Sequence, residues 1–197
     1  MTRSKAGNSA SEQKAANEVT LLDAVMRRDR GAFAELYRLY HPRLFGYLHR
    51  ILSNAAIAEE VLDDVMFVVW KDARRFRGQA AVSSWIFGIA YRKAMTAIRK
   101  ESRYQSLLNH GTDVNTVPAK ASQDGELIQA ALMQLSPDHR QVVELTYFGG
   151  FSYQEIATIA GCPVNTIKTR MFHARRRLKY LLPILAGADE EQNREQA

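Results

Sequence analysis

Basic and amide side chains recur along one segment near the C-terminus, where their spacing suits contacts with nucleic acid. The segment Val164–Lys179 is rich in Lys, Arg, Asn and Thr and contains no acid. On a helical wheel its candidate contact residues are Asn165, Thr166, Lys168, Thr169, Arg170, Phe172, His173 and Arg176. Asn, Lys and Arg donate to base edges, and cations neutralise phosphates. The plainer alternative is a solvated basic face on an ordinary helical hairpin.

The residues before this segment predict where two consecutive helices begin and end. Ser152 is a predicted N-cap, and Glu155 three residues later completes a capping box. Gly161 breaks this first helix where a left-handed residue can close its C-terminus. Pro163 fits the start of a second helix, whose inner face is Ile167, Met171, Ala174 and Leu178. Two helices joined by a tight turn predict a helix-turn-helix, and the combination favours DNA binding over the solvated-face alternative.

The composition is that of a small globular protein with a net positive charge. The chain has 197 residues and a formal net charge of +6, and one cysteine, Cys162. The length allows one or two small domains, and the charge suits a polyanionic partner without requiring one. A single cysteine excludes an internal disulfide and a Cys-rich metal site. We predict no metal, no cofactor and no catalytic residues. The sequence has neither a long apolar run nor a signal peptide, so we expect a cytoplasmic protein without membrane insertion.

Apolar residues recur at helical spacing and no alternating strand pattern appears, so we expect an all-α fold of two small helical domains joined by a flexible linker. The first domain is predicted at 18–100 and the second, with the helix-turn-helix, at 124–182. Residues 101–123 lose periodicity and are predicted to be the linker. Polar residues at 1–17 and 183–197 are predicted to be tails.

Helix bounds follow from the same pattern. In the first domain we expect helices at 18–28, at 33–52 with a kink or restart at Pro42, at 56–76, and from Ser83 or Ser84 to about residue 100. In the second we expect helices at 124–135 and, after the Ser136 N-cap, at 137–148.

The predicted helix 56–76 carries an acidic and aromatic stripe opposite its apolar face. The stripe consists of Glu60, Asp63, Phe67, Trp70 and Arg74. Phe and Trp lose favourable burial on a solvent face. Either a fourth helix covers these rings, or they anchor a protein partner.

The next predicted helix presents Trp85, Gly88, Arg92, Met95 and Arg99 on its outer face. Planar rings and guanidinium groups on one stripe suit unstacked bases, and a glycine permits close approach of a backbone. The alternative is a packed tryptophan with two solvated arginines.

Five stretches, in order, carry a family resemblance: FAELYRLYHPRLFGYL, AEEVLDDVMFVVWKDARRFRG, SSWIFGIAYRKAMTAIRK, LSPDHRQVVELTYFGGFSYQEIA and CPVNTIKTRMFHARRRL. Together they span most of 33–178. The chain resembles bacterial sigma factors of the extracytoplasmic-function group, the compact sigma-70 relatives with regions two and four only. The resemblance implies a protein that binds RNA polymerase core and directs it to particular promoters.

The resemblance also implies roles for the three faces. The helix 164–179 would read the minus-thirty-five element as duplex. The residues implied to engage the minus-ten element and the opened strand are Arg77, Gln79, Trp85, Arg92, Lys93, Met95, Thr96 and Arg99. The stripe of Glu60, Asp63, Asp64, Phe67 and Trp70 would dock on the clamp helices of the largest polymerase subunit, and the flap region is a second expected contact. Where relatives often carry an Asn soon after the Ile-Ala pair, this chain has Tyr91, Arg92 and Lys93.

Further partners and two rival functions remain at this point. The family implies an anti-sigma factor that covers these surfaces. A stand-alone helix-turn-helix regulator would bind DNA tightly without polymerase. A helical adaptor would bind a protein without reading DNA.

Overall fold

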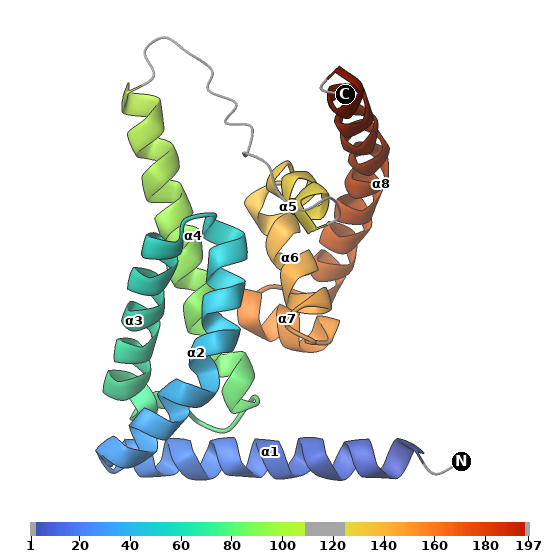
Figure 1. Ribbon diagram of the computed structural model, residues 1–197. Coiled ribbons are helices and arrows are strands. Elements are labelled where there is room, and N and C mark those ends of the chain that lie inside the picture. The colour runs from blue at the N-terminus through green and yellow to red at the C-terminus, as the bar shows by residue number, and fades with distance from the viewer. Residues whose placement is uncertain (1–2, 109–124, 196–197) are drawn as a thin grey trace.

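The structure, a computed structural model, describes residues 3–108 and 125–195. Within these ranges all regular secondary structure is helical, which confirms the predicted fold class (Figure 1). The elements are α1 Arg3–Met26, α2 Arg30–Leu52, α3 Ala55–Asp72, the 3-10 turn η1 Ala73–Arg75, α4 Val82–Leu108, α5 Gly125–Met133, α6 Pro137–Tyr147, α7 Tyr153–Ala160 and α8 Val164–Glu195.

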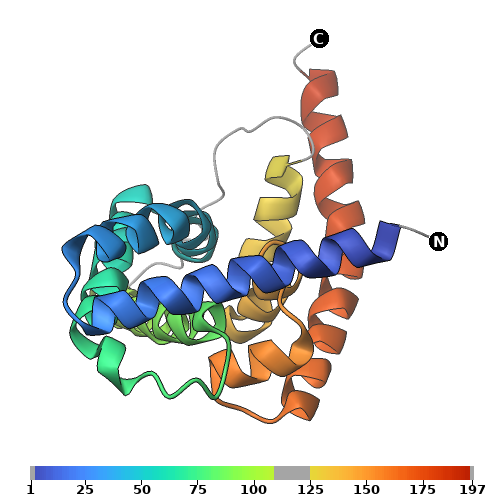
Figure 2. The same ribbon diagram turned by 90° about the horizontal axis from the view of Figure 1, so that it is seen from below.

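Helices α2, α3 and α4 run side by side and form the N-terminal domain, with α1 lying across one end of them (Figures 1 and 2). Each helix buries most of the apolar residues that its spacing placed on one face. Leu22 of α1, Leu36 and Leu44 of α2, Leu62 of α3 and Ile86 of α4 are fully buried in one cluster. This packing fixes which faces of α3 and α4 are left for other contacts.

Helix α2 differs from its prediction both in the residue at which it begins and in its course through Pro42. Asp29 caps it by accepting a hydrogen bond from the Ala32 N–H at 3.0 Å, so it begins at Arg30. It then runs unbroken through Pro42 to Leu52. Of the two predicted alternatives the restart is wrong, because the buried residues on both sides of Pro42 pack into one core and hold the two halves as one helix. The kink stays a prediction.

The ends of three predicted segments are more helical than the sequence suggested. Residues 3–17, predicted as a tail, continue α1, and α8 continues through Pro183 to Glu195 where a second tail was predicted. Helix α4 begins at Val82, so neither Ser83 nor Ser84 is its cap, and it extends over 101–108 of the predicted linker. The rest of that linker lies outside the described residues, at 109–124.

In the C-terminal domain, α5 to α8 pack around buried apolar residues, and the caps predicted for α6 and α7 are confirmed here. Ser136 caps α6. The Ser152 hydroxyl accepts from the Glu155 N–H at 3.3 Å while the Glu155 carboxylate accepts from the Ser152 N–H at 2.8 Å. Gly161 has φ 65°, the left-handed conformation that ends α7. Helix α8 then begins at Val164, directly after Pro163.

The two domains are packed against each other. Helix α7 lies along α4 and α6 lies against α2, and the buried residues of both domains form one continuous cluster. The Phe87 and Phe151 rings, one from each domain, meet edge to face with centroids 4.9 Å apart. The sequence predicted two helical modules but gave no sign of this contact.

No helix among the described residues has the length and apolar content needed to cross a membrane. Nor do their His, Cys, Asp and Glu side chains gather into a group suited to a metal ion.

Candidate nucleic-acid and partner-protein interfaces

The outer face of α8 is exposed, basic and aromatic, as predicted. Ile167, Met171 and Ala174 are buried on the inner side. The exposed side chains of the predicted contact set are Asn165, Lys168, Thr169, Phe172, His173 and Arg176, while Thr166 is half-buried. Phe172 is 61% exposed in the middle of this face. A ring this exposed contributes little to the packing of the fold.

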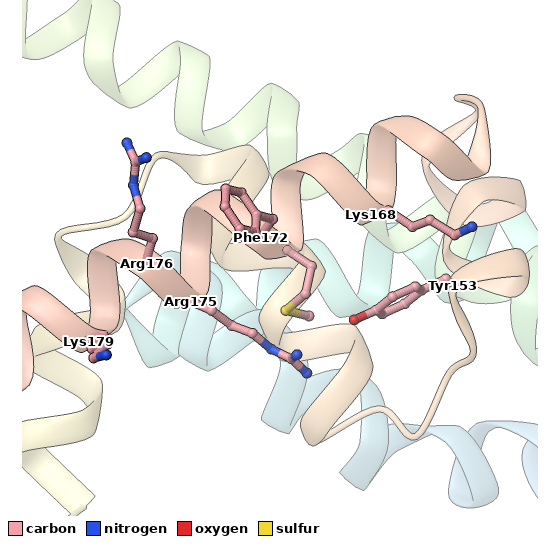
Figure 3. A pocket seen from close by; sticks show the side chains of 7 residues that line it. Tyr153, Lys168, Phe172, Arg175, Arg176 and Lys179 are labelled. Carbon is pink, nitrogen blue, oxygen red and sulfur yellow. The ribbon is translucent and has the colours of Figure 1, made fainter.

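A shallow hollow of about 360 Å³ lies beside this face. It is lined by Tyr153 of α7 and by Lys168, Met171, Phe172, Arg175, Arg176 and Lys179 of α8 (Figure 3). Tyr153 and Arg175 point toward each other, whereas Arg176 projects from the other side of α8 (Figure 3). The sequence did not single out Tyr153, since its position one residue after a helix cap carries no sign that it reaches α8.

Arg170 and His173 have partners on α6. The Arg170 Nη2 donates to Asp138 Oδ2 at 2.6 Å, so Arg170 does not lie freely on the outer face as predicted. The geometry places it at the side of α8 that meets α6, where a carboxylate neutralises it. The His173 ring stacks on His139 with centroids 6.1 Å apart. Partial burial, and secondly the nearby His173, lower the pKa of His139.

The predicted minus-ten residues divide into exposed and packed groups. Arg77, Gln79, Arg92, Thr96 and Arg99 are exposed, and Met95 is half-buried. The Trp85 ring packs on Phe76 with centroids 5.5 Å apart, which agrees with the packed alternative for this residue. Lys93 Nζ pairs with Asp64 Oδ2 at 2.7 Å, so these members of two predicted faces contact each other.

Gly88 does not lie on a free face of α4. An ideal Cβ there would be 3.6 Å from the Ile159 carbonyl oxygen of α7. The close backbone approach that the glycine permits is therefore to the helix-turn-helix. The wheel could not show this, because the covering helix lies about seventy residues further along the chain.

The α3 stripe is exposed at its acidic and aromatic centre. Glu60, Asp63 and Asp64 are exposed, and Phe67 is 63% exposed. The Tyr37 hydroxyl donates to Asp63 at 3.0 Å. Burial, together with this hydrogen bond, raises the pKa of Tyr37 to about 12.

Trp70, at the end of the stripe, is partly covered. Its ring lies 5.1 Å from that of Phe33, and the Arg28 guanidinium lies 5.3 Å from its centroid. A fourth helix therefore does not cover Phe67, and Trp70 is covered in part by Phe33 of α2 and by Arg28, which precedes α2.

Arg140 forms buried hydrogen bonds that join the ends of two helices, which the sequence did not predict. It is 8% exposed and donates to the Leu132, Met133 and Leu135 carbonyls near the end of α5 and to the Ile51 carbonyl near the end of α2. Burial lowers its pKa. Carbonyls in the last turn of a helix have no donor in a following turn, and Arg140 supplies one; the Leu132 carbonyl also accepts from the Leu135 N–H at 3.1 Å. Its position on the inner side of α6 could have indicated these contacts, because a buried arginine needs several acceptors.

The fold and these faces define a class: a two-domain helical protein with a helix-turn-helix and a separate exposed acidic–aromatic face on α3. Comparison with known proteins agrees. Residues 36–104 match the family described as "Sigma-70 region 2", and residues 125–178 match "Sigma-70, region 4".

Curated relatives cover most of the chain. The ECF RNA polymerase sigma factor SigK of Mycobacterium bovis (strain BCG / Pasteur 1173P2) is 30% identical over 176 residues, covering 83% of this chain and 94% of the relative. The ECF RNA polymerase sigma factor RpoE of Cereibacter sphaeroides is 34% identical over 167 residues, covering 82% and 92%. This chain belongs to the extracytoplasmic-function group of the sigma-70 family.

A solved relative has the same architecture. The sigma factor RpoE of Bartonella quintana, in complex with the anti-sigma factor NepR, has a TM-score of 0.65 and 29% identity, covering 77% of this chain and 97% of that one. The family is one of non-enzymatic transcription initiation factors. The chain is a sigma factor that directs promoter-specific transcription.

Proposed function

We propose that this sigma factor grips promoter DNA at two points while one face holds it on RNA polymerase core. Helix α8 reads the minus-thirty-five duplex, exposed side chains of α4 and of the turn before it hold the opened minus-ten strand, and the α3 stripe docks on the clamp helices. The observation that carries the proposal is the pairing of two exposed faces in one chain. Phe172 stands among cations on α8, and Phe67 among acids on α3.

The chemistry of each face fits its partner. We expect Lys168 and Arg175 to contact phosphates, which strengthens binding without selecting sequence. We expect Arg176 to donate to base edges, and each good bidentate pair is worth about 1–3 kcal/mol. On α3, an exposed ring flanked by carboxylates suits a basic helical surface with an apolar groove.

The proposed role also predicts the binding partners of the protein and its location in the cell. The family's solved relative is bound to an anti-sigma factor, and we propose that a protein of that kind covers the same faces here. The flap region of the polymerase is the proposed contact of the C-terminal domain. We place the protein in the cytoplasm, where core polymerase and promoter DNA meet, and we expect the polymerase alone to supply the catalytic chemistry.

A mobility-shift assay with and without core polymerase tests the proposal. We expect weak binding of the free chain to promoter duplex and strong, salt-sensitive, sequence-selective binding once core is added, because core holds the two modules at the separation of the two elements. Tight selective binding without core would support the stand-alone regulator instead. Core binding without any DNA selectivity would support the adaptor.

Phe172 is expected to read thymine through its 5-methyl group, the apolar feature of the major groove. We predict that replacing thymine by deoxyuridine in the minus-thirty-five duplex weakens holoenzyme binding about fourfold per contacted methyl, since burying one such group is worth about 0.8 kcal/mol. Phe172→Ala should bind both duplexes equally. Tyr180→Ala removes an equally exposed ring from the same helix and should keep the thymine preference. Equal affinity of the unmodified protein for both duplexes would refute this role.

A further inference from the structure

Two histidines from different helices stack at the edge of the outer face of α8. His139 lies in the first turn of α6 and His173 on the exposed side of α8, and their ring centroids are 6.1 Å apart with planes 22° apart. His173 also meets the exposed Phe172 ring edge to face, with centroids 5.5 Å apart. Helices α6 and α8 lie side by side (Figure 1). The face of α8 is therefore continued onto α6 by His139, which the sequence did not single out.

The surroundings of His139 disfavour its charged form in the free protein. Partial burial, then His173 and Arg170, lower the pKa of His139, and Asp138 opposes them with the smallest effect. Both oxygens of Asp138 already accept hydrogen bonds, Oδ2 from Arg170 in an ion pair at 2.6 Å and Oδ1 from the Tyr91 hydroxyl at 3.3 Å. The positive end of the helix dipole also disfavours a cation in the first turn of α6. Near neutral pH His139 is therefore mostly neutral.

Charged side chains from the other helices that pack on α6 add positive charge or pair elsewhere. On α4, Arg92 and Arg99 line the same cleft as that ion pair. On α2, Arg50 donates to the Glu144 carboxylate, near the C-terminal end of α6. On α7, Glu155 belongs to the N-cap of its own helix. The charges of the ion pair cancel, so it supplies no net negative charge for an imidazolium.

An anion that reaches the two rings reverses this preference. Two neighbouring imidazolium rings repel each other, whereas an anion within hydrogen-bond reach favours the charged form of each. The anion that the outer face of α8 is proposed to meet is a DNA phosphate, and the exposed Lys168 and Arg176 on that face attract the same backbone. A charged imidazole donates from both ring nitrogens, so it can bind a phosphate oxygen directly.

We propose that His139 and His173 form a phosphate-contact site that becomes charged when α8 binds duplex, so that recognition of the minus-thirty-five element takes up a proton. Protonation and DNA binding then favour one another, and the affinity for duplex rises as the pH falls. A difference of one pKa unit between the free and bound forms of one ring corresponds to about tenfold in affinity. This inference rests on the duplex-reading role proposed for α8.

Competition binding with holoenzyme that contains the full-length protein measures this coupling. Holoenzyme is assembled at one pH and then tested between about pH 6 and about pH 8, the range in which histidine titrates. The probes are a minus-thirty-five duplex and a scrambled duplex of equal length, at constant ionic strength. We expect the minus-thirty-five duplex to bind about tenfold more tightly at the acidic end of this range than at the basic end.

Substitutions at one position separate charge from structure. His139→Gln keeps a donor but never becomes charged, so it should bind like the parent at the basic end and lose most of the gain at the acidic end. His139→Lys is charged throughout and should bind at the basic end about as tightly as the parent does at the acidic end. His49→Gln removes an exposed histidine from α2 and should keep the pH dependence of the parent.

Neutral methylphosphonates, placed at one phosphate of the minus-thirty-five duplex at a time, locate the contact. The pH dependence of the parent should disappear at one position or at two neighbouring positions and persist at the others. Persistence at every position would mean that the proton is taken up elsewhere, and this would overturn the proposal.

The remaining outcomes separate this inference from the function on which it rests. A parent that selects its duplex equally at every pH keeps the duplex-reading role and overturns only the proton-coupled site. A His139→Gln form with the full pH dependence of the parent, or one weakened equally at every pH, overturns it as well, since the second result shows a merely structural role. No preference for the minus-thirty-five duplex over the scrambled one at any pH would contradict the duplex-reading role itself.

Discussion

Changing Asp63 to Asn and Phe67 to Ala together is expected to weaken binding to RNA polymerase core about a thousandfold. Both side chains are exposed on α3, and Phe67 is 63% exposed. A ring and a charge at the centre of an interface are each worth about 2 kcal/mol or more when truncated, and about 4 kcal/mol corresponds to nearly three orders of magnitude in Kd. Titration of labelled core with each protein measures the loss.

The same variant should fold normally, because neither side chain fills the core. Unfolding in urea is expected to change by no more than about 0.5 kcal/mol for Phe67→Ala, as for other exposed positions. Asp23→Asn with Tyr104→Ala removes an exposed acid and an exposed ring from α1 and α4, and should bind core like the parent. Unchanged core affinity of the Asp63 and Phe67 double variant would show that α3 docks elsewhere or not at all.

Replacing Arg140 by Met is expected to lower the free energy of unfolding by about 3–5 kcal/mol, a large part of the total for a small domain. Met has a similar length but no donor, so the carbonyls of Ile51, Leu132 and Met133, each 3.0 Å from an Arg140 nitrogen, lose this partner. The Leu132 carbonyl keeps the Leu135 N–H as a donor at 3.1 Å, so the loss falls mainly on the Ile51 and Met133 carbonyls. Each buried group left without a partner costs about 1–3 kcal/mol. Urea unfolding followed by circular dichroism measures the change.

The control is an arginine of the same domain that makes no such contacts to backbone. Arg177 is exposed and lies over the Tyr180 ring, so Arg177→Ala should shift stability by about 0.5 kcal/mol at most. Equal unfolding midpoints for Arg140→Met and the parent would mean that the Arg140 contacts contribute nothing net.

Local features could be predicted from the sequence because short-range chemistry determines them. The Ser152–Glu155 capping box, the left-handed Gly161 and the inner face of α8 each depend on residues within a few turns of one another. The exposure of Phe67 and Phe172 follows from the same helical periodicity.

Features set by distant segments could not be predicted in this way. Gly88 faces α7 and Arg140 reaches back to Ile51, and neither contact leaves a periodic trace in the sequence. Pro42 was expected to interrupt α2, but the packing of residues on both sides of it outweighs the lost hydrogen bond. The contact between the domains belongs to the same category, since it depends on how two finished modules fit.

Transcription in vitro on a library of random promoters, with purified core polymerase and with or without this protein, is the most direct measurement of its role. We predict start sites that depend on the added protein and share one minus-thirty-five and one minus-ten sequence at a fixed separation. The same start sites with core alone, or no start site that depends on the protein, would contradict a promoter-reading role for this chain.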